Sequence, residues 1–335
     1  MSNARFDVIA VGNAIVDVLS PATEEFLKEE GIARNAMTLI DEERARVLYD
    51  RMQPGKEASG GSAANTVAGI ASLGGKAAYI GKVADDQLGE IFTHDIRNIG
   101  VYFDTPPLKN GPATARCLIN VTPDAHRSMS TFLGAAALVT EEDVEAGEAA
   151  LKASEIVYLE GYLFDREEAK RGYVAAAEMA AAASRRTALT LSDVFCVERH
   201  RAAFRHLVAN HIDILLANEA ELLALYETDD FDTALETVRD DVAIAAVTRS
   251  EKGAVIVAGR ETVTVKAEPV SKLVDTTGAG DLFASGFLLG LARGRSLAEA
   301  GRMGAICAAE IISHYGARPD RNLHALVDAA GIAFG

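Results

Sequence analysis

Phe6-Asp-Val-Ile-Ala-Val-Gly12 is a run of apolar residues that ends at a glycine, and this pattern predicts a short buried strand. Similar runs recur along the chain, and helix-length stretches lie between them. The predicted strands are 78–80, 156–159, 188–191, 212–216 and 242–247, and the predicted helices are 62–73, 86–99, 166–184 and 218–226. This alternation predicts an α/β fold, a doubly wound and mostly parallel sheet with helices on both faces.

One region departs from this alternation. The β-runs 114–121 and 127–133 are joined by Pro123-Asp-Ala-His126, and they predict a hairpin, which parallel cores seldom contain. With the short run 37–40, the hairpin predicts a small β-lid inserted from about residues 14–58 and 103–135 into one domain that spans 1–335. The C-terminal third is expected to add strands 254–257 and 262–266 and helices 280–292 and 297–314.

Charge and composition exclude several classes of protein. Among 335 residues, 33 Lys and Arg face 49 Asp and Glu, so the net charge of −16 would repel nucleic acid and anionic bilayers. The first apolar run is soon interrupted by Gly12, Asn13 and Asp17, which predicts neither a signal peptide nor a membrane span, and we expect a cytoplasmic protein. The three cysteines lie far apart, and the histidines lack zinc-site spacing, so free thiols and no protein-bound zinc are expected.

The stretch Asp275-Thr-Thr-Gly-Ala-Gly-Asp281-Leu-Phe-Ala-Ser-Gly286 runs from a glycine pair directly into a predicted helix. The first amides of a helix lack internal acceptors and lie at the positive end of its dipole, so Gly278, Ala279 and Gly280 can bind a phosphoryl group. Asp281 could accept the proton of an attacking hydroxyl beside it. The alternative interpretation is an ordinary acidic residue in the first turn of a helix.

A second glycine cluster, Gly60-Gly61-Ser62-Ala-Ala-Asn65, also opens a predicted helix. Asn65, one turn in, is expected to point back toward the loop and to converge with Asn13 and Asp17 at the carboxyl end of the sheet. Such short polar groups suit sugar hydroxyls. A glycine turn capped by Ser62 is the alternative. Neither GxxxxGK[ST] nor GxGxxG occurs, which excludes a P-loop and argues against a dinucleotide fold.

These two glycine motifs resemble the two signatures of the ribokinase, or PfkB, family of carbohydrate and nucleoside kinases, in order and over nearly the whole chain. Within the family the sequence is most similar to the adenosine kinase branch. The secondary motifs that carry this similarity are Gly12-Asn-Ala-Ile-Val-Asp17, Val121-Thr-Pro-Asp-Ala-His-Arg127, Glu160-Gly-Tyr-Leu-Phe-Asp165 and Thr248-Arg-Ser-Glu-Lys-Gly253.

The resemblance implies an ATP- and Mg²⁺-dependent kinase with Asp281 as general base and Gly278, Ala279 and Gly280 as the anion hole. Arg127 in the lid is expected to meet phosphate charge, with a solvated strand arginine as the alternative. With Asn13, the substrate set is Asp17, Gly61, Asn65, Arg127 and Tyr162. The residues implied at the ATP and magnesium site are Asn218, Glu221 (acting on the metal through water), Thr248, Ser250 and Gly253. A K⁺ site near Asp275 and Thr277 is common in the family.

The substrate expected is adenosine, phosphorylated at its 5′-hydroxyl to give AMP. A purine needs a broad apolar slot with an aromatic face, for which Tyr162 is the candidate, with Ile15, Met129 and Leu133 as further lining or as ordinary core. Ribose, fructose or another nucleoside remains an alternative substrate. A nucleoside or sugar sensor without turnover is the alternative of another class, and the protein is expected as a monomer or a homodimer.

Overall fold

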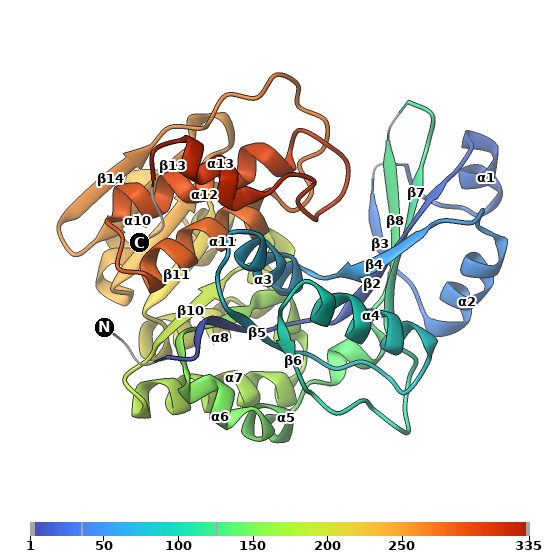
Figure 1. Ribbon diagram of the computed structural model, residues 1–335, viewed down its shortest axis with the longest axis horizontal. Coiled ribbons are helices and arrows are strands. Elements are labelled where there is room, and N and C mark those ends of the chain that lie inside the picture. Colours follow the sequence, from blue (N-terminus) through green and yellow to red (C-terminus); the bar gives the residue numbers. More distant parts are fainter. Residues whose placement is uncertain (1–3, 35, 125, 333–335) are drawn as a thin grey trace.

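A nine-stranded sheet forms the body of the protein in the computed structural model, which describes residues 4–34, 36–124 and 126–332 (Figure 1). The strand order is β14-β13-β12-β11-β10-β9-β1-β5-β6, and only the pairs β12–β13 and β13–β14 are antiparallel. The strands are β1 (Phe6–Val11), β5 (Ala77–Ile80), β6 (Tyr102–Phe103), β9 (Ser154–Glu160), β10 (Arg186–Thr190), β11 (Ile214–Asn218), β12 (Ile244–Thr248), β13 (Ala254–Ala258) and β14 (Glu261–Val265).

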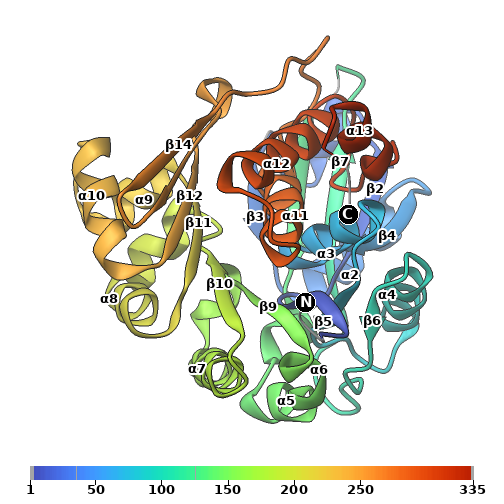
Figure 2. The same ribbon diagram turned by 60° about the vertical axis from the view of Figure 1, so that its left-hand side comes forward.

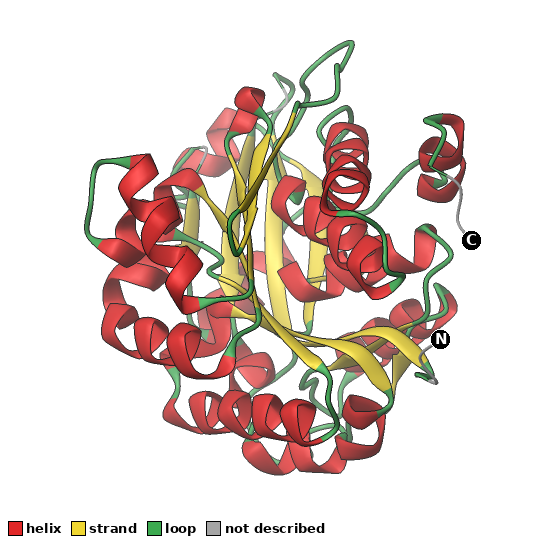
Figure 3. Ribbon diagram, turned by 90° about the vertical axis from the view of Figure 1, so that its left-hand side faces the viewer, coloured by secondary structure: helices red, strands yellow, loops and turns green. Residues whose placement is uncertain are grey.

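Helices cover both faces of this sheet, which confirms the doubly wound α/β prediction (Figures 2 and 3). Val8 and Ala10 of β1 pack into one core, whereas Ile9 and Val11 pack into the other, because successive strand residues point to opposite faces. The helices that pack into the core of the first face include α3 (Ser62–Ser72), α4 (Gln87–Asn98), α11 (Ala279–Ala292), α12 (Leu297–Ile311) and α13 (Leu323–Ala329). Those of the second face are α5 (Glu141–Ala146), α6 (Glu148–Lys152), α7 (Glu167–Ala182), α8 (Val194–His211), α9 (Glu219–Tyr226) and α10 (Phe231–Asp241).

A second sheet of five strands stands beside the body, in the order β3-β8-β7-β2-β4 (Figure 1). We call this sheet, with the helices α1 (Glu24–Glu29) and α2 (Glu42–Arg51) on its outer side, the lid. Its strands are β2 (Ile15–Pro21), β3 (Met37–Leu39), β4 (Lys56–Gly60), β7 (Ala115–Val121) and β8 (Arg127–Phe132). The antiparallel pair β7–β8 is the hairpin expected from the sequence, although Ala125 of its turn lies outside the described residues.

The strands of the lid come from residues 15–60 and 115–132, whereas the segments expected from the sequence are about 14–58 and 103–135. Strand β4 continues to Gly60, and Phe103 belongs to β6 of the large sheet. Phe103 is buried against Phe92 of α4 (Gln87–Asn98) and Tyr79 of β5, with ring centroids 5.5 and 6.0 Å away. Phe103 therefore belongs to the aromatic core of the body and not to the lid. The expected span of one domain, 1–335, includes residues 1–3 and 333–335, which are also outside the described residues.

The order of the strands reverses its winding direction between β1 and β9. From β1 the chain continues through the lid and α3 to β5 on one side, whereas β9 leads through α7 to β10 on the other. Open α/β sheets bind ligands where the winding direction reverses in this way. The loop after β1, the loop after β9 and the lid all meet there.

Candidate active site

Asp281 lies in the first turn of α11 and is held by side chains from the start of α3. Its Oδ1 accepts a hydrogen bond from Ser62 Oγ at 2.6 Å, and its Oδ2 accepts one from Asn65 Nδ2 at 3.0 Å. Burial raises the pKa of the Asp281 carboxyl, while these two hydrogen bonds and the charge of Arg318 lower it. Asp281 as a whole residue keeps an intermediate solvent exposure. The structure thus brings the two glycine motifs together around one acid.

Gly278 starts α11 in the left-handed region, with φ of +80°, and a Cβ there would lie 3.0 Å from that of Ala317. An added Cβ on Gly280 would meet nothing within 4 Å, so the space in front of this glycine is open. The amide of Ala279 donates to the Thr276 carbonyl at 3.2 Å. Within the described residues, the amides of Gly278 and Gly280 face no backbone acceptor. Two of the three expected anion-binding amides are therefore available, and that of Ala279 serves the turn.

Asn65 and Gly61 lie at the start of α3, as the sequence predicts. Gly61 has φ of +98°, and a Cβ on it would lie 2.2 Å from the carbonyl oxygen of Asn13, so no other residue fits without movement. Ser62 is the first residue of the helix rather than its cap, because its hydroxyl is turned to Asp281. Asn65 is 5% exposed, and its Oδ1 is buried with no donor among the described residues. That oxygen can accept a hydrogen bond from a substrate hydroxyl.

Asn13 lies deeper than the sequence suggests. It is buried, and its Nδ2 donates to Glu160 Oε1 at 2.7 Å, while the Ala63 amide donates to Glu160 Oε2 at 2.7 Å. Burial raises the pKa of Glu160 to about 7, although these hydrogen bonds oppose the shift. Glu160 therefore links the end of β9 to the loop after β1 and to the start of α3. The sequence contains Glu160 in one of the secondary motifs but predicts no role for it.

Asp17 and Arg127 come from the lid and face the body. Burial raises the pKa of Asp17 to about 6, against the charges of Arg318 and Arg127. Arg127 is buried and forms an ion pair with Asp275, so it is not a solvated strand residue. Its Nε and Nη2 are buried without an acceptor in the described part of the chain. Two orphaned donors of a guanidinium fit an anion such as a phosphate group.

Tyr162 follows β9 and is 38% exposed, so its aromatic ring can contact a ligand. Its hydroxyl donates to the Ser192 carbonyl oxygen at 3.2 Å. Burial and nearby carboxylates, among them Asp281, raise the pKa of this phenol. The phenol therefore stays neutral at physiological pH.

The expected nucleotide residues gather at the ends of β11 and β12. Asn218 pairs with Thr248 across these strands, and Asn218 and Glu221 form a reciprocal cap at the start of α9. Both carboxylate oxygens of Glu221 accept from Asn218, at 2.6 and 2.9 Å. Burial first, and then the charges of Asp193 and Asp281, raise the pKa of Glu221 to about 7. Ser250 and Gly253 form a tight turn after β12, with φ of +50° and +85°.

A metal would find few direct protein ligands here. No group of three or more His, Cys, Asp or Glu side chains that could hold a metal ion occurs in residues 4–34, 36–124 and 126–332. Mg²⁺ commonly keeps several waters and binds through substrate phosphates. Both carboxylate oxygens of Glu221 are already engaged by Asn218, and its action on the metal through water stays a prediction. The three cysteines are free and buried, as expected.

Arg318 is the residue of this site that sequence reasoning missed. It lies 37 positions after Asp281 in the loop that follows α12, outside both glycine motifs. Its guanidinium donates to the carbonyl oxygens of Ser59 and Ala64. Nothing in the local sequence marks it, since only tertiary packing brings this loop to α3.

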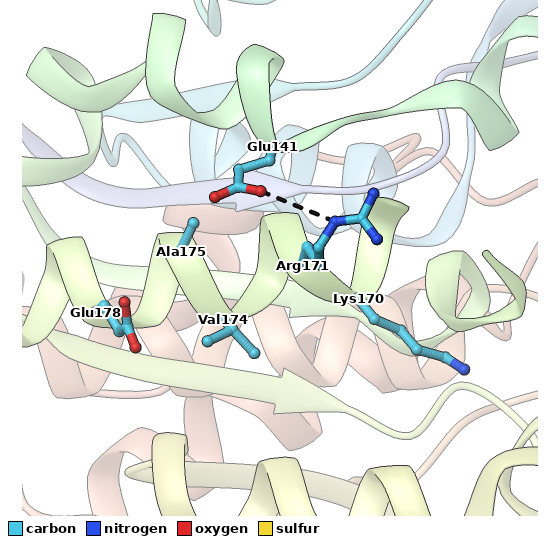
Figure 4. Close-up of a pocket in the computed structure, with 6 residues that line it drawn as sticks. All are labelled: Glu141, Lys170, Arg171, Val174, Ala175 and Glu178. Atoms are coloured by element: carbon cyan, nitrogen blue, oxygen red, sulfur yellow. Dashed lines mark ion pairs between the residues drawn. The ribbon is translucent and has the colours of Figure 1, made fainter. Parts of the chain in front are cut away.

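A shallow depression elsewhere on the surface has no part in this site (Figure 4). Its volume is about 300 Å³, and it lies along α7 beside Glu141. Glu141 and Arg171 form an ion pair across it at 4.0 Å. Charged side chains that neutralise one another on an open surface do not indicate a ligand.

Comparison with known proteins decides the family. The model of the pfkB family carbohydrate kinases matches residues 31–323. This chain belongs to that family. Being a pfkB family kinase, it is a phosphotransferase that acts on a hydroxyl acceptor, and its substrate is a small molecule of the nucleoside or sugar class. ATP is the phosphoryl donor that the family implies, and Mg²⁺ is generally required with it.

Two solved structures and one curated relative are similar over most of this kinase. A structure named adenosine kinase from Sinorhizobium meliloti is 52% identical, with a TM-score of 0.89, and covers 98% of this chain and 100% of that chain. A probable sugar kinase from Rhizobium etli CFN 42 is 50% identical, with a TM-score of 0.90 and the same coverage. Adenosine kinase of Saccharomyces cerevisiae is 27% identical over 92% of this chain and 95% of its own. No helix of the described residues has the length and apolar character of a membrane span.

Proposed function

We propose that this kinase transfers the γ-phosphoryl group of ATP to the 5′-hydroxyl of adenosine. The choice of substrate rests on the composition of the face that the lid turns toward the body. Directly paired strand residues share a face, and one row across the lid reads Leu39, Thr131, Cys117 and Asp17. The next row contains Met37, Met129 and Ile119. The lid thus offers one carboxylate within an apolar surface.

This composition favours a nucleoside over a free sugar. Met37 and Leu39 are 50% and 55% exposed on that face, and Tyr162 is exposed after β9. A purine gains from apolar and aromatic surface, whereas a sugar alone needs mainly hydrogen bonds. Arg127, on the same face, forms an ion pair with Asp275 of the body, so this face is directed at the segment that leads into α11 and Asp281. The 52% identity to a structure named adenosine kinase supports the same substrate.

The proposed chemistry uses few groups of this chain. Asp17 and Asn65 would orient the ribose hydroxyls, and Asp281 would accept the proton of the 5′-hydroxyl at its carboxylate. The amides of Gly278 and Gly280, together with the free donors of Arg127, would stabilise negative charge on the phosphoryl oxygens. Asn218, Glu221, Thr248, Ser250 and Gly253 would border the nucleotide. Mg²⁺, when bound, supplies neutralising charge on the phosphates.

The test is ADP release across a substrate panel of adenosine, inosine, guanosine, ribose and fructose. We expect kcat/KM to be highest for adenosine. Asp281→Asn should lower kcat by a factor on the order of 10² to 10⁴ with ATP affinity nearly unchanged, because only the proton acceptor is lost. Faster turnover of ribose or fructose would contradict adenosine as the substrate. It would favour a sugar kinase, which is the name of the Rhizobium etli structure. Equal activity of the Asn variant would remove Asp281 from the mechanism.

A further inference from the structure

Arg318 lies in the loop between α12 and α13, and its neighbours contact the segment that leads into α11. The Gly316 amide donates to Asp275 Oδ2 at 3.4 Å, and Ala317 is the residue that a Cβ on Gly278 would meet. One tripeptide, Gly316 to Arg318, therefore touches the anion-binding segment with its first two residues. Its third residue reaches in another direction.

The guanidinium of Arg318 forms hydrogen bonds at both ends of the turn between β4 and α3. Its Nε and Nη2 donate to the Ser59 carbonyl oxygen at 2.9 and 2.7 Å, and Nη2 also donates to Ser59 Oγ at 2.8 Å. Its Nη1 donates to the Ala64 carbonyl oxygen at 2.7 Å. Asp95 of α4 holds Ser59 from the other side through the Ser59 amide, at 2.8 Å.

The β4–α3 turn leads into the residues that donate hydrogen bonds to the candidate base, Asp281. Ser62 and Asn65 both donate to the carboxylate of Asp281, and both lie at or next to the segment between Ser59 and Ala64. A planar guanidinium with several fixed donors restrains such a turn more tightly than a single ammonium could. A shift of the turn would move both donors relative to Asp281.

Arg318 also supplies positive charge among several acids. Its charge lowers the pKa of both Asp17 and Asp281, and burial lowers the pKa of Arg318 itself. Arg127 also acts on Asp17. The other groups that interact electrostatically with Arg318 or Asp281 are Tyr79, Asp95, Tyr158, Glu160, Tyr162 and Glu221.

We propose that Arg318 is a positioning residue for phosphoryl transfer, which fixes the β4–α3 turn against the α11 segment and supplies the charge that keeps Asp281 ready as a base. This inference rests on the proposed role of Asp281. It adds a residue from outside both glycine motifs. Arg318 acts through Ser62, Asn65 and its own charge rather than through contact with substrate.

The experiment compares Arg318→Gln, Arg318→Lys and a control, Arg302→Gln, which removes a half-exposed arginine from α12. In Arg318→Gln we expect kcat to fall about 10- to 100-fold, with KM for ATP little changed. The acidic limb of the kcat/KM profile should move up by about one pH unit, since a positive charge beside the acid is lost. Arg318→Lys should keep the limb in place and lose about 3- to 10-fold in kcat, because a single ammonium restrains the turn less tightly. Arg302→Gln should change neither.

The position of the acidic limb of the kcat/KM profile distinguishes a positioning role of Arg318 from a merely structural one. A structural arginine would lower the thermal midpoint and kcat but would leave the acidic limb at the wild-type pH. An unmoved limb, or an unchanged kcat, in Arg318→Gln would therefore overturn the proposal. If that variant does not fold, an unchanged kcat in Arg318→Lys would overturn it.

A second measurement does not depend on turnover. In protein labelled with ¹³C at aspartate carboxyls, the Asp281 resonance, assigned through Asp281→Asn, should titrate at higher pH in Arg318→Gln than in the wild type. An unchanged midpoint contradicts the inference. A wild-type protein that phosphorylates none of the panel refutes the proposed function instead, and the titration still decides the role of Arg318.

Discussion

Ser62 contributes one hydroxyl to the site, and that hydroxyl donates to Asp281 at 2.6 Å. The bond stabilises the ionised carboxylate and lowers its pKa against the effect of burial. We expect Ser62→Ala to raise the pKa of Asp281, so the acidic limb of kcat/KM should move to higher pH by on the order of one unit. Activity should therefore be lost mainly at low pH, which a pH–rate profile measures.

The matched control is Ser72→Ala at the other end of α3, where the hydroxyl accepts from the Leu323 amide at 3.2 Å. It removes the same group from the same helix and should leave the limb where it is. A Ser62→Ala enzyme with the wild-type profile would show that the hydroxyl does not tune this acid.

At the scale of elements, the β4–α3 turn depends on Gly61. Replacing it with alanine combines a positive φ with a contact of 2.2 Å to the Asn13 carbonyl oxygen, so the start of α3 must shift. We expect Gly61→Ala to lower the free energy of unfolding by about 3 kcal/mol or more and to abolish most activity. Gly100→Ala is the control, because Gly100 has a similar φ of +89° but nothing within 4 Å.

Urea unfolding separates the two effects in these variants. Gly100→Ala should lose only the backbone contribution, about 1 to 2 kcal/mol, and keep its activity. Equal losses in both glycine variants would mean that the turn tolerates the side chain by moving, and that the close approach at Gly61 is not what requires glycine.

For the whole molecule, stability should depend on pH through its buried acids. The pKa of Glu160 is raised from 4.5 to about 7, so the folded state binds its proton more tightly than the unfolded state does. Its contribution is fully present below pH 4.5 and is lost as the pH rises toward 7, on the order of 3 kcal/mol. Glu221 and Asp17 act in the same direction, and self-repulsion of the net charge of −16 adds to it.

Urea titrations between pH 4.5 and 8 measure this slope. Glu160→Gln should be less stable at low pH but should show a smaller further loss as the pH rises. Glu148→Gln on the surface of α6 serves as the control and should keep the wild-type slope. A slope that stays the same in Glu160→Gln would show that this acid does not bind its proton more tightly on folding.

The sequence alone determined the fold class and the position of the candidate base. Strand and helix periodicity is local, so the run 6–12 and its repeats predict the doubly wound sheet without knowledge of any contact. The two glycine motifs are contiguous, and each places its polar residue at a helix start, where backbone geometry is also local. Asp281, Gly278, Gly61 and Asn65 could therefore be named in advance.

Only the tertiary structure decided which partners these residues have. It turned Asn13 toward Glu160, joined Arg127 to Asp275, occupied the Ala279 amide with the Thr276 carbonyl, and brought Arg318 to the turn before α3. Most of these contacts join residues that are more than a hundred positions apart, and an arginine that serves such a contact has no local pattern. Such pairings depend on how the sheet, the lid and the C-terminal loop pack together, because burial and charge act through space rather than along the chain.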